Sequence, residues 1–244
     1  MNFVDISNWQ GNNGLKLSEI ANEIDAVICK ATEGTYYVDP YCDDFIEQAK
    51  ALGKKWGFYH FAGEGNPIYE ADFFIEHCAN YFKHGIPCLD WETGESIEWV
   101  NTFVRRVYEK TGVWCWIYSW PRSFTEEVEQ NCGRWICEYP SHLLYPDFNC
   151  NEGETPDCNG LVCAWQFASD GRIGEYYANL DMNRFYGDKK AWDAYAKAEP
   201  IEDEDEDIEP EPEPVPVHPT TEYQIYEDDK IEISIKIVHK NNTI

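Results

Sequence analysis

The chain has 244 residues, of which 46 are acidic and 19 basic, so its net charge is −27 at neutral pH. So negative a chain is not expected to bind nucleic acid, which requires a basic stripe. The length is sufficient for one sizeable core, and no apolar run is long enough to span a membrane.

Apolar strand-like segments alternate with amphipathic helix-like stretches over residues 1–195. The predicted strands cover residues 3–7, 25–31, 55–62, 86–92, 113–119, 134–139, 161–168 and 179–182. The predicted helices cover residues 41–52, 68–82, 97–111 and 189–198. This alternation predicts an α/β fold with a parallel sheet. Eight strands in this length favour an irregular barrel that lacks some of its helices.

The strand at residues 86–92 ends in two acids, Asp90 and Glu92. Alternate side chains of a strand point the same way, so both carboxyl groups should face one side. Two carboxyl groups at this spacing raise the pKa of one of them, which leaves an acid beside an anion at neutral pH. Glycoside hydrolysis uses such a pair. The alternative is a solvated strand end with two unrelated acids.

Two further strand-like segments each carry an acid. Asp5 lies in the first predicted strand and Asp181 in the last. Buried acids are unfavourable unless they are paired or functional. A closed barrel of parallel strands brings the strand ends together at one face, where the active sites of such barrels lie. We therefore expect Asp5, Asp90, Glu92 and Asp181 in one site.

Seven short motifs follow one another along residues 1–195. They are DISNWQG at 5–11, KATEG at 30–34, GFYHFA at 57–62, LDWE at 89–92, WIYS at 116–119, AWQF at 164–167 and LDMN at 180–183. In this order they resemble the motifs of the Chalaropsis-type lysozymes, glycoside hydrolase family 25. The resemblance implies an irregular TIM-like (β/α) barrel. It also implies a muramidase that cleaves the β-1,4 bond between N-acetylmuramic acid and N-acetylglucosamine in peptidoglycan, without cofactor or metal.

In such an enzyme we expect Glu92 to be the general acid that protonates the leaving oxygen. Asp90 would stay ionised and orient the 2-acetamido group, whose oxygen attacks C1 as an internal nucleophile. The resemblance adds Asp5 and Asp181 as hydrogen-bonding and electrostatic partners.

The expected sugar contacts are one lysine and four aromatic residues, with barrel packing as the alternative for each ring: Lys30, Tyr37, Tyr59, Tyr118 and Trp165. Trp9 and Gln10 are expected to be structural. His60 is expected to be a hydrogen-bonded core histidine rather than a base.

Three alternatives remain for the function. A chitinase-like hydrolase would need acids at positions 85 and 88, where this chain has Gly85 and Cys88. A non-catalytic sugar-binding barrel would usually have lost its acid, whereas Glu92 is present. A virion-associated wall-piercing component would use the C-terminal segment as its docking element.

Residues 199–220 change character to a run of acids followed by Glu-Pro repeats, which predicts a stiff linker without a core. In residues 221–244, isoleucines alternate from Ile231 to Ile237 after a polar turn, which predicts a short β-hairpin. An isolated hairpin is marginal in water, and an apolar strand edge recruits a partner strand. We expect this tail to form a homo-oligomer, with wall targeting as the alternative.

The sequence runs from Met1 directly into the first strand without a signal peptide, unless one was removed. This favours a phage endolysin, made in the host cytoplasm and released through a holin-type pore. Five of the ten cysteines lie in different predicted strands, where a free thiol packs as a small apolar group. We expect these five to be reduced, and Cys132, Cys150 and Cys158 are the best candidates for any bridge.

Overall fold

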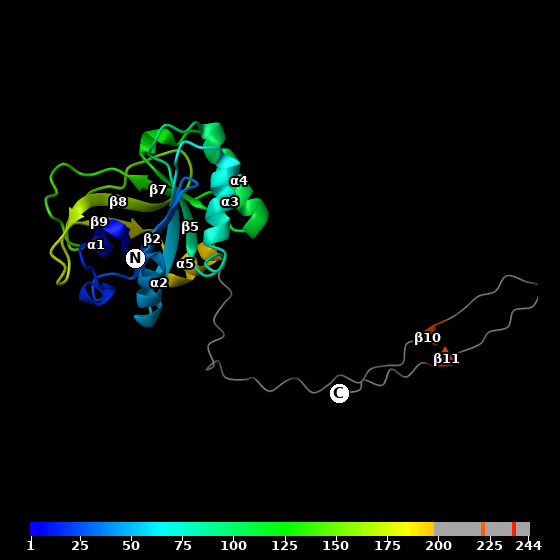
Figure 1. Cartoon of the computed structure of the whole chain (residues 1–244), viewed down its shortest axis with the longest axis horizontal. Coiled ribbons are helices and arrows are strands. Elements are labelled where there is room, and N and C mark those ends of the chain that lie inside the picture. Colours follow the sequence, from blue (N-terminus) through cyan, green and yellow to red (C-terminus); the bar gives the residue numbers. More distant parts are fainter. Residues whose placement is uncertain (198–220, 223–235, 238–244) are drawn as a thin grey trace, which may run out of the picture. The chain divides into compact units, whose positions relative to one another are not determined.

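The computed structural model describes residues 1–197, 221–222 and 236–237 (Figure 1). The chain divides into two units, Met1–Pro200 and Ile201–Ile244, which are described separately. Among the described residues, no helix is long and apolar enough to cross a membrane.

The first unit is built on a closed barrel of eight strands. In chain order they are β1 (Asn2–Ile6), β2 (Ala26–Glu33), β4 (Lys55–Phe61), β5 (Ile86–Asp90), β6 (Trp116–Ser119), β7 (Arg134–Cys137), β8 (Val162–Gly171) and β9 (Leu180–Phe185). Pairing of β1 with β2 closes the ring, and the short β3 (Tyr37–Val38) pairs with β2 outside it. The predicted α/β barrel and all eight predicted strands are confirmed.

One strand departs from the expected parallel arrangement. β9 runs antiparallel to both β1 and β8, whereas the other barrel neighbours are parallel. Only residues 172–179 connect β8 to β9. A parallel crossover needs about a dozen residues or more, so this connection returns the chain antiparallel.

Helices cover part of the barrel. α2 (Cys42–Ala51) and α3 (Pro67–His77) pack on the strands near β2, and α4 (Ile97–Thr111) lies beside α3 (Figure 1). The predicted helices are confirmed, with α3 ending earlier than expected. Local chemistry sets their ends: Asn66 caps α3 ahead of Pro67, and Ser96 caps α4. Gly112 ends α4 in the left-handed conformation, with φ at 75°.

The barrel is irregular, as expected, because several connections lack a helix. Within the described residues 116–185, no α-helix separates β6, β7, β8 and β9, and the only helical turn is the 3-10 turn η2 (Pro121–Ser123). The short α1 (Asn8–Asn12) and the 3-10 turn η1 (Leu17–Glu19) were not predicted. α5 (Lys189–Ala196) confirms the closing helix.

The interior of the barrel is apolar at one end. Phe3, Trp116 and Phe185 point inward, and Trp192 of α5 packs against all three rings at centroid distances of 5.3–5.7 Å. Because side chains alternate along a strand, the next inward-facing residue of each strand lies two positions away, one layer closer to the opposite end of the barrel. Those positions carry polar residues, beginning with Asp5 two residues after Phe3. The aromatic plug therefore forms a dry floor beneath a polar cavity.

The ten cysteines all lie within residues 1–197, and each carries a free thiol in this structure. Eight are buried, and Cys150 and Cys158 are half-buried. Burial raises the pKa of the Cys88 and Cys115 thiols well above the usual range, which keeps them protonated and unreactive.

Of the second unit, the structure describes one antiparallel pair, β10 (Thr221–Glu222) with β11 (Lys236–Ile237). The predicted linker at 199–220 and the isoleucine-rich stretch from 223 to 235 lie outside the described residues. The hairpin and the homo-oligomer that it would form stay predictions.

A buried arginine ties together the loops that flank β7. The Arg134 guanidinium is fully buried and donates to the backbone carbonyls of Val128, Glu129, Cys132 and Asn159 at 2.8–3.2 Å. No carboxylate pairs with it among the described residues. Its charge is therefore stabilised by carbonyl dipoles and by the Phe124 ring, whose centre lies 5.2 Å from the guanidinium carbon.

We predict that Arg134→Met lowers the free energy of unfolding by about 3 kcal/mol, because it leaves several buried carbonyl groups without donors. Arg105→Met is the matched control, since the Arg105 side chain is 57% exposed and pairs with Glu129 alone. The control should cost less than ~1 kcal/mol. Urea unfolding of both variants measures the difference, and equal losses would show that Arg134 does not hold these loops.

Candidate active site

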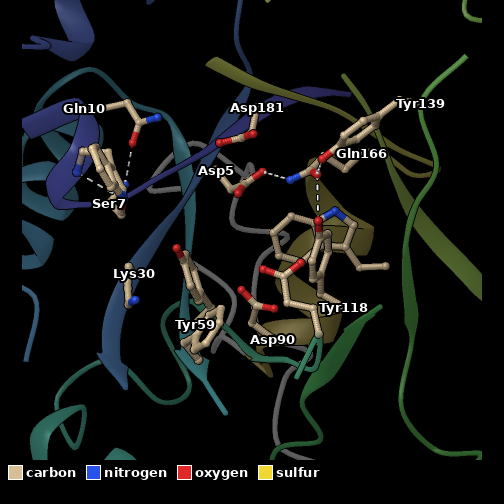
Figure 2. Close-up of a pocket in the computed structure, with 14 residues that line it drawn as sticks. Asp5, Ser7, Gln10, Lys30, Tyr59, Asp90, Tyr118, Tyr139, Gln166 and Asp181 are labelled. Atoms are coloured by element: carbon tan, nitrogen blue, oxygen red, sulfur yellow. Dashed lines mark hydrogen bonds between the residues drawn. The ribbon is translucent and has the colours of Figure 1, made fainter. Parts of the chain in front are cut away.

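A cavity of about 360 Å³ opens at the carboxyl ends of the parallel strands. Figure 2 shows the residues that line it. They are Asp5, Ser7, Trp9, Gln10, Lys30, Tyr59, Phe61, Asp90, Glu92, Tyr118, Trp135, Tyr139, Gln166 and Asp181.

The structure brings together the four acids that the sequence singles out. Asp5 and Asp181 are paired residues of the neighbouring strands β1 and β9, so their side chains lie side by side. Asp90 lies across the cavity from them (Figure 2). Asp90 is the last residue of β5, and Glu92 follows two residues later. Although β5 ends at Asp90, both side chains line the cavity, as their alternation predicts. Asp181 is the second residue of β9. Because β9 is antiparallel, its start lies at the end of the barrel where the parallel strands finish.

Two side-chain amides fix the orientation of Asp5. Asn183 and Gln166 each donate an N–H to Asp5 Oδ2 at 2.8 Å. The Gln166 carbonyl oxygen in turn accepts from the hydroxyl groups of Tyr118 at 2.8 Å and Tyr139 at 2.5 Å. The two tyrosines therefore hold the amide so that its N–H group faces the carboxylate.

Three residues of this network were not among the predicted site residues: Gln166, Asn183 and Tyr139. Gln166 and Asn183 each lie within a quoted motif, and Asn183 shares the inward face of β9 with Asp181. Trp135 Nε1 donates to Asn183 Oδ1 at 2.8 Å, which orients that amide as well. Alternation along β8 and β9 was the signal that could have identified both amides.

Burial raises the pKa of every carboxyl group in the cluster. The pKa of Asp5 rises to about 6, because burial and the nearby Glu92 charge outweigh its two hydrogen bonds. Asp90 and Asp181 are raised well above the usual range, first by burial and then by the neighbouring acids. Burial also raises the pKa of Glu92, and the charge of Lys30 opposes that shift. The cluster therefore retains protons at neutral pH.

The surroundings of Asp90 oppose one expectation. Asp90 was expected to stay ionised beside a protonated Glu92. In the structure Asp90 is 9% exposed, and its Oδ1 atom is buried without a hydrogen-bond partner among the described residues. An ionised carboxylate is unfavourable in such a place, so burial and the neighbouring acids favour the protonated form of Asp90.

Lys30 lines the cavity as expected, and a neighbouring acid holds its side chain. Its Nζ atom lies 2.5 Å from Glu33 Oε2 and 4.7 Å from the centre of the Phe61 ring. The Tyr37 ring centre lies 5.5 Å from the same Nζ atom, but Tyr37 does not line the cavity. Tyr37 packs near Lys30, and its sugar contact stays a prediction.

The aromatic predictions are met in part. Tyr59 and Tyr118 line the cavity, whereas Trp165 does not. Trp165 is 1% exposed on the outer side of β8, where its indole N–H donates to the Glu138 carbonyl at 2.8 Å. The barrel-packing alternative describes Trp165 in this structure, because Gln166 takes the inward position of that motif.

Trp9 was expected to be structural, yet its side chain is 73% exposed and lines the cavity. The Ser7 hydroxyl accepts from the Trp9 N–H, and Gln10 completes a capping box with Ser7 at the start of α1. Gln10 is thus structural as predicted, although it also lines the cavity. An exposed indole on a capped helix is suited to stacking on a sugar face.

His60 is a core histidine, as expected. It is fully buried, with Nδ1 2.8 Å from Thr32 Oγ1 and Nε2 3.1 Å from Glu70 Oε2. Burial lowers the pKa of His60, and Glu70 opposes that shift. Glu70 also accepts from the backbone N–H groups of Gly63 and Gly65, so the pair anchors the loop after β4.

Over the part of the chain that the structure describes, no group of three or more His, Cys, Asp or Glu side chains is arranged to hold a metal ion. Among the four acids of the cavity, Asp5 instead accepts from two side-chain amides, Gln166 and Asn183.

Because its pKa is raised, Asp90 should make the stability of the fold depend on pH. A carboxyl group whose pKa is higher in the folded state stabilises the fold below about pH 4, and this contribution is lost as pH rises through the folded pKa. Asp90→Asn should therefore match the wild type near pH 4 and have the higher melting temperature at pH 7. A rise of about 2–4 °C would correspond to ~1 kcal/mol in a domain of this size.

Thermal unfolding across this pH range measures the difference. The control is the same change at the exposed Asp157, which should leave the melting temperature unaltered at each pH. An Asp90→Asn protein that is less stable at pH 7 would show that ionised Asp90 supports the fold.

Comparison with known proteins agrees with this geometry. The model of the family "Glycosyl hydrolases family 25" matches residues 4–176. An N,O-diacetylmuramidase of Chalaropsis sp. is 30% identical over 157 residues, covering 59% of this chain and 67% of that protein. A lysozyme of Streptococcus phage Cp-9 is 24% identical over 184 residues, covering 69% of this chain and 51% of that protein.

Among solved structures, a muramidase from Acremonium alcalophilum superposes with a TM-score of 0.62 at 25% identity, covering 81% of this chain and 99% of that one. The chain spans between 51% and 67% of the length of the curated relatives that it matches. The match over residues 4–176, on a barrel that gathers the motif acids in one cavity, shows that the chain belongs to glycoside hydrolase family 25.

Proposed function

We propose that the protein is a peptidoglycan muramidase. It cleaves the β-1,4 bond between N-acetylmuramic acid and N-acetylglucosamine. The observation that carries this proposal is the cluster of four carboxyl groups with raised pKa values in one open cavity. The curated relative from Chalaropsis, itself named a muramidase, supports the choice of substrate.

Glu92 is the general acid in this proposal. It is the least enclosed of the four acids, so it can reach the leaving oxygen of a bound glycan. Its pKa is raised by burial, which keeps a proton available near neutral pH.

Asp90 assists the substrate. Its Oδ1 atom has no partner within the described residues and can accept the N–H of the 2-acetamido group. That hydrogen bond favours the ionised form of Asp90, so Asp90 releases its proton to solvent when substrate binds, while Glu92 keeps its own proton. The acetamido oxygen then attacks C1, and the bond to the leaving oxygen breaks as Glu92 donates its proton. Asp5, whose pKa of about 6 leaves it largely ionised at pH 7, supplies negative charge that stabilises the positive charge developing at C1, and Asp181 lies beside it.

A phage endolysin is the biological role that we propose for this activity. The lysozyme of Streptococcus phage Cp-9 is its support among the relatives. In this role the enzyme is made in the host cytoplasm and reaches the wall through a holin-type pore. Lysis of a host that co-expresses a holin tests the role, and co-purification with virions would indicate a wall-piercing virion component instead.

We predict that Glu92→Gln lowers the rate of wall lysis by at least about a hundredfold, because the variant cannot protonate the leaving oxygen. Turbidity clearance of purified walls gives the rate, and mass analysis of the fragments identifies the bond that is cut. Glu98→Gln on α4 is the control and should retain full activity. Near-wild-type lysis by a folded Glu92→Gln protein would refute the assignment.

We predict that a glycan without the muramic N-acetyl group is cut at least tenfold more slowly than the acetylated glycan, since the internal nucleophile is missing. Asp90→Asn should be strongly impaired on the acetylated glycan and should discriminate less between the two. Steady-state rates on matched soluble glycans provide the test. Equal wild-type rates on both substrates would indicate a carboxylate nucleophile from the protein.

A further inference from the structure

A second cavity of about 360 Å³ adjoins the active site. Residues from two connections line it: Trp120, Pro121 and Arg122 follow β6, and Cys137, Glu138 and Tyr139 end or follow β7. Tyr139 also lines the active-site cavity, so one phenol ring forms the boundary between the two spaces. A substituent on a sugar in the active site can therefore extend into the second cavity.

The backbone of this second cavity is held in place. Tyr139 is fixed by its hydroxyl bond to Gln166, which is itself bound to Asp5. The Glu138 backbone N–H donates to the backbone carbonyl of Gln166 at 3.2 Å, and the Glu138 backbone carbonyl accepts from Trp165 Nε1 at 2.8 Å. Trp165, which does not contact the active site, thus helps to position the wall of this neighbouring cavity.

The opposite wall is a 3-10 turn that also has fixed contacts. Trp120 is its N-cap, and the Ser123 N–H donates to the Trp120 carbonyl at 2.9 Å. Arg122 lies with its guanidinium 5.4 Å from the centre of the Trp120 ring. A site on two such supported segments is preorganised for a ligand.

The cavity presents two opposite charges. Arg122 and Glu138 are exposed, and neither forms an ion pair with another residue in the described part of the chain. An arginine fork is suited to a carboxylate, and a glutamate to an ammonium group. The rings of Trp120 and Tyr139 provide apolar surface for aliphatic carbons between those groups.

We propose that this cavity is a subsite for the peptide stem that the muramic acid carries. A free carboxylate of the stem binds Arg122, and the free amine of its diamino acid binds Glu138. This inference rests on the proposed muramidase function. The occupant follows from the charges, because a neutral N-acetylated sugar gains nothing from a cation and an anion placed together. The volume also lies in the range of small-ligand sites and accommodates a short peptide.

The test compares two forms of one glycan, with its peptide stems intact or removed by an amidase. The lactyl carboxylate that the amidase exposes on each muramic acid is capped as its methylamide, so that the two forms differ only in the peptide. The wild type should have the higher kcat/KM on the peptide-bearing form, through a lower KM. Arg122→Gln and Glu138→Gln should each reduce this preference by about three- to fivefold, the range for an exposed charge pair. The double variant should lose most of the preference and keep the wild-type rate on the bare glycan.

The matched control is the double variant Lys110→Gln/Glu76→Gln, which removes one exposed positive and one exposed negative charge from α4 and α3. It should keep the full preference. Two substrate arms separate the roles: amidated stems should lose their sensitivity to Arg122→Gln, and N-acetylated stems their sensitivity to Glu138→Gln.

Two results would overturn the subsite. One is an unchanged preference in the Arg122→Gln/Glu138→Gln protein. The other is an equal loss on both glycans, which would show that the cavity binds the sugar chain itself.

Failure of the muramidase proposal is distinguishable, because the wild type would then cut neither glycan. In that case saturation-transfer NMR with the free tetrapeptide stem decides the matter. Signal transfer with the wild type but not with the double variant supports the peptide site, and equal transfer with both refutes it.

Discussion

The structure depends on placing four carboxyl groups together at one end of a barrel while the other end remains dry. Repulsion and burial both act against ionisation there, and the fold offsets them with a few fixed dipoles. Gln166 and Asn183 both donate to one oxygen of Asp5, and each amide is oriented by further donors. Asp90 lacks comparable support at Oδ1 among the described residues, so burial disfavours its charged form until a donor arrives. The substrate is the natural source of that donor.

Closing the barrel with an antiparallel strand is part of the same arrangement. In a fully parallel barrel, an acid near the start of a strand would lie at the floor. Because β9 is reversed, its start lies at the open end and pairs Asp181 with Asp5. The short connection from residue 172 to 179 thus determines both the strand direction and the fourth acid of the site. The floor keeps its aromatic plug, in which Trp192 fills the space between Phe3, Trp116 and Phe185.

Sequence patterns were sufficient for the strands and for the four acids, because period-two alternation is a strong local signal. Asp90 and Glu92 share a face for that reason alone. The direction of β9 was not predicted, since it depends on the length of a loop rather than on the strand. Trp165 was a candidate sugar contact on its residue type alone, but it alternates with the inward-facing Gln166 and therefore lies on the outer side of β8. The place of Trp9 in the cavity lining was not predicted, because Trp9 lies on a five-residue helix after β1. So short a helix has no periodic sequence pattern.

The acid strength of the site is set by opposing effects that one ion pair can balance. Burial raises the pKa of Glu92, and Lys30 lowers it. Lys30 is the one basic side chain lining the cavity in the described structure, and Glu33 binds its Nζ atom at 2.5 Å. Glu33 therefore keeps part of the lysine charge away from the acids and holds it against the ring of Phe61. If Lys30 were unrestrained, it would approach the carboxylates and favour their ionised forms, and the supply of protons at neutral pH would fall. The neighbouring acid thus preserves the acidity on which general-acid chemistry depends, although it does not itself line the cavity.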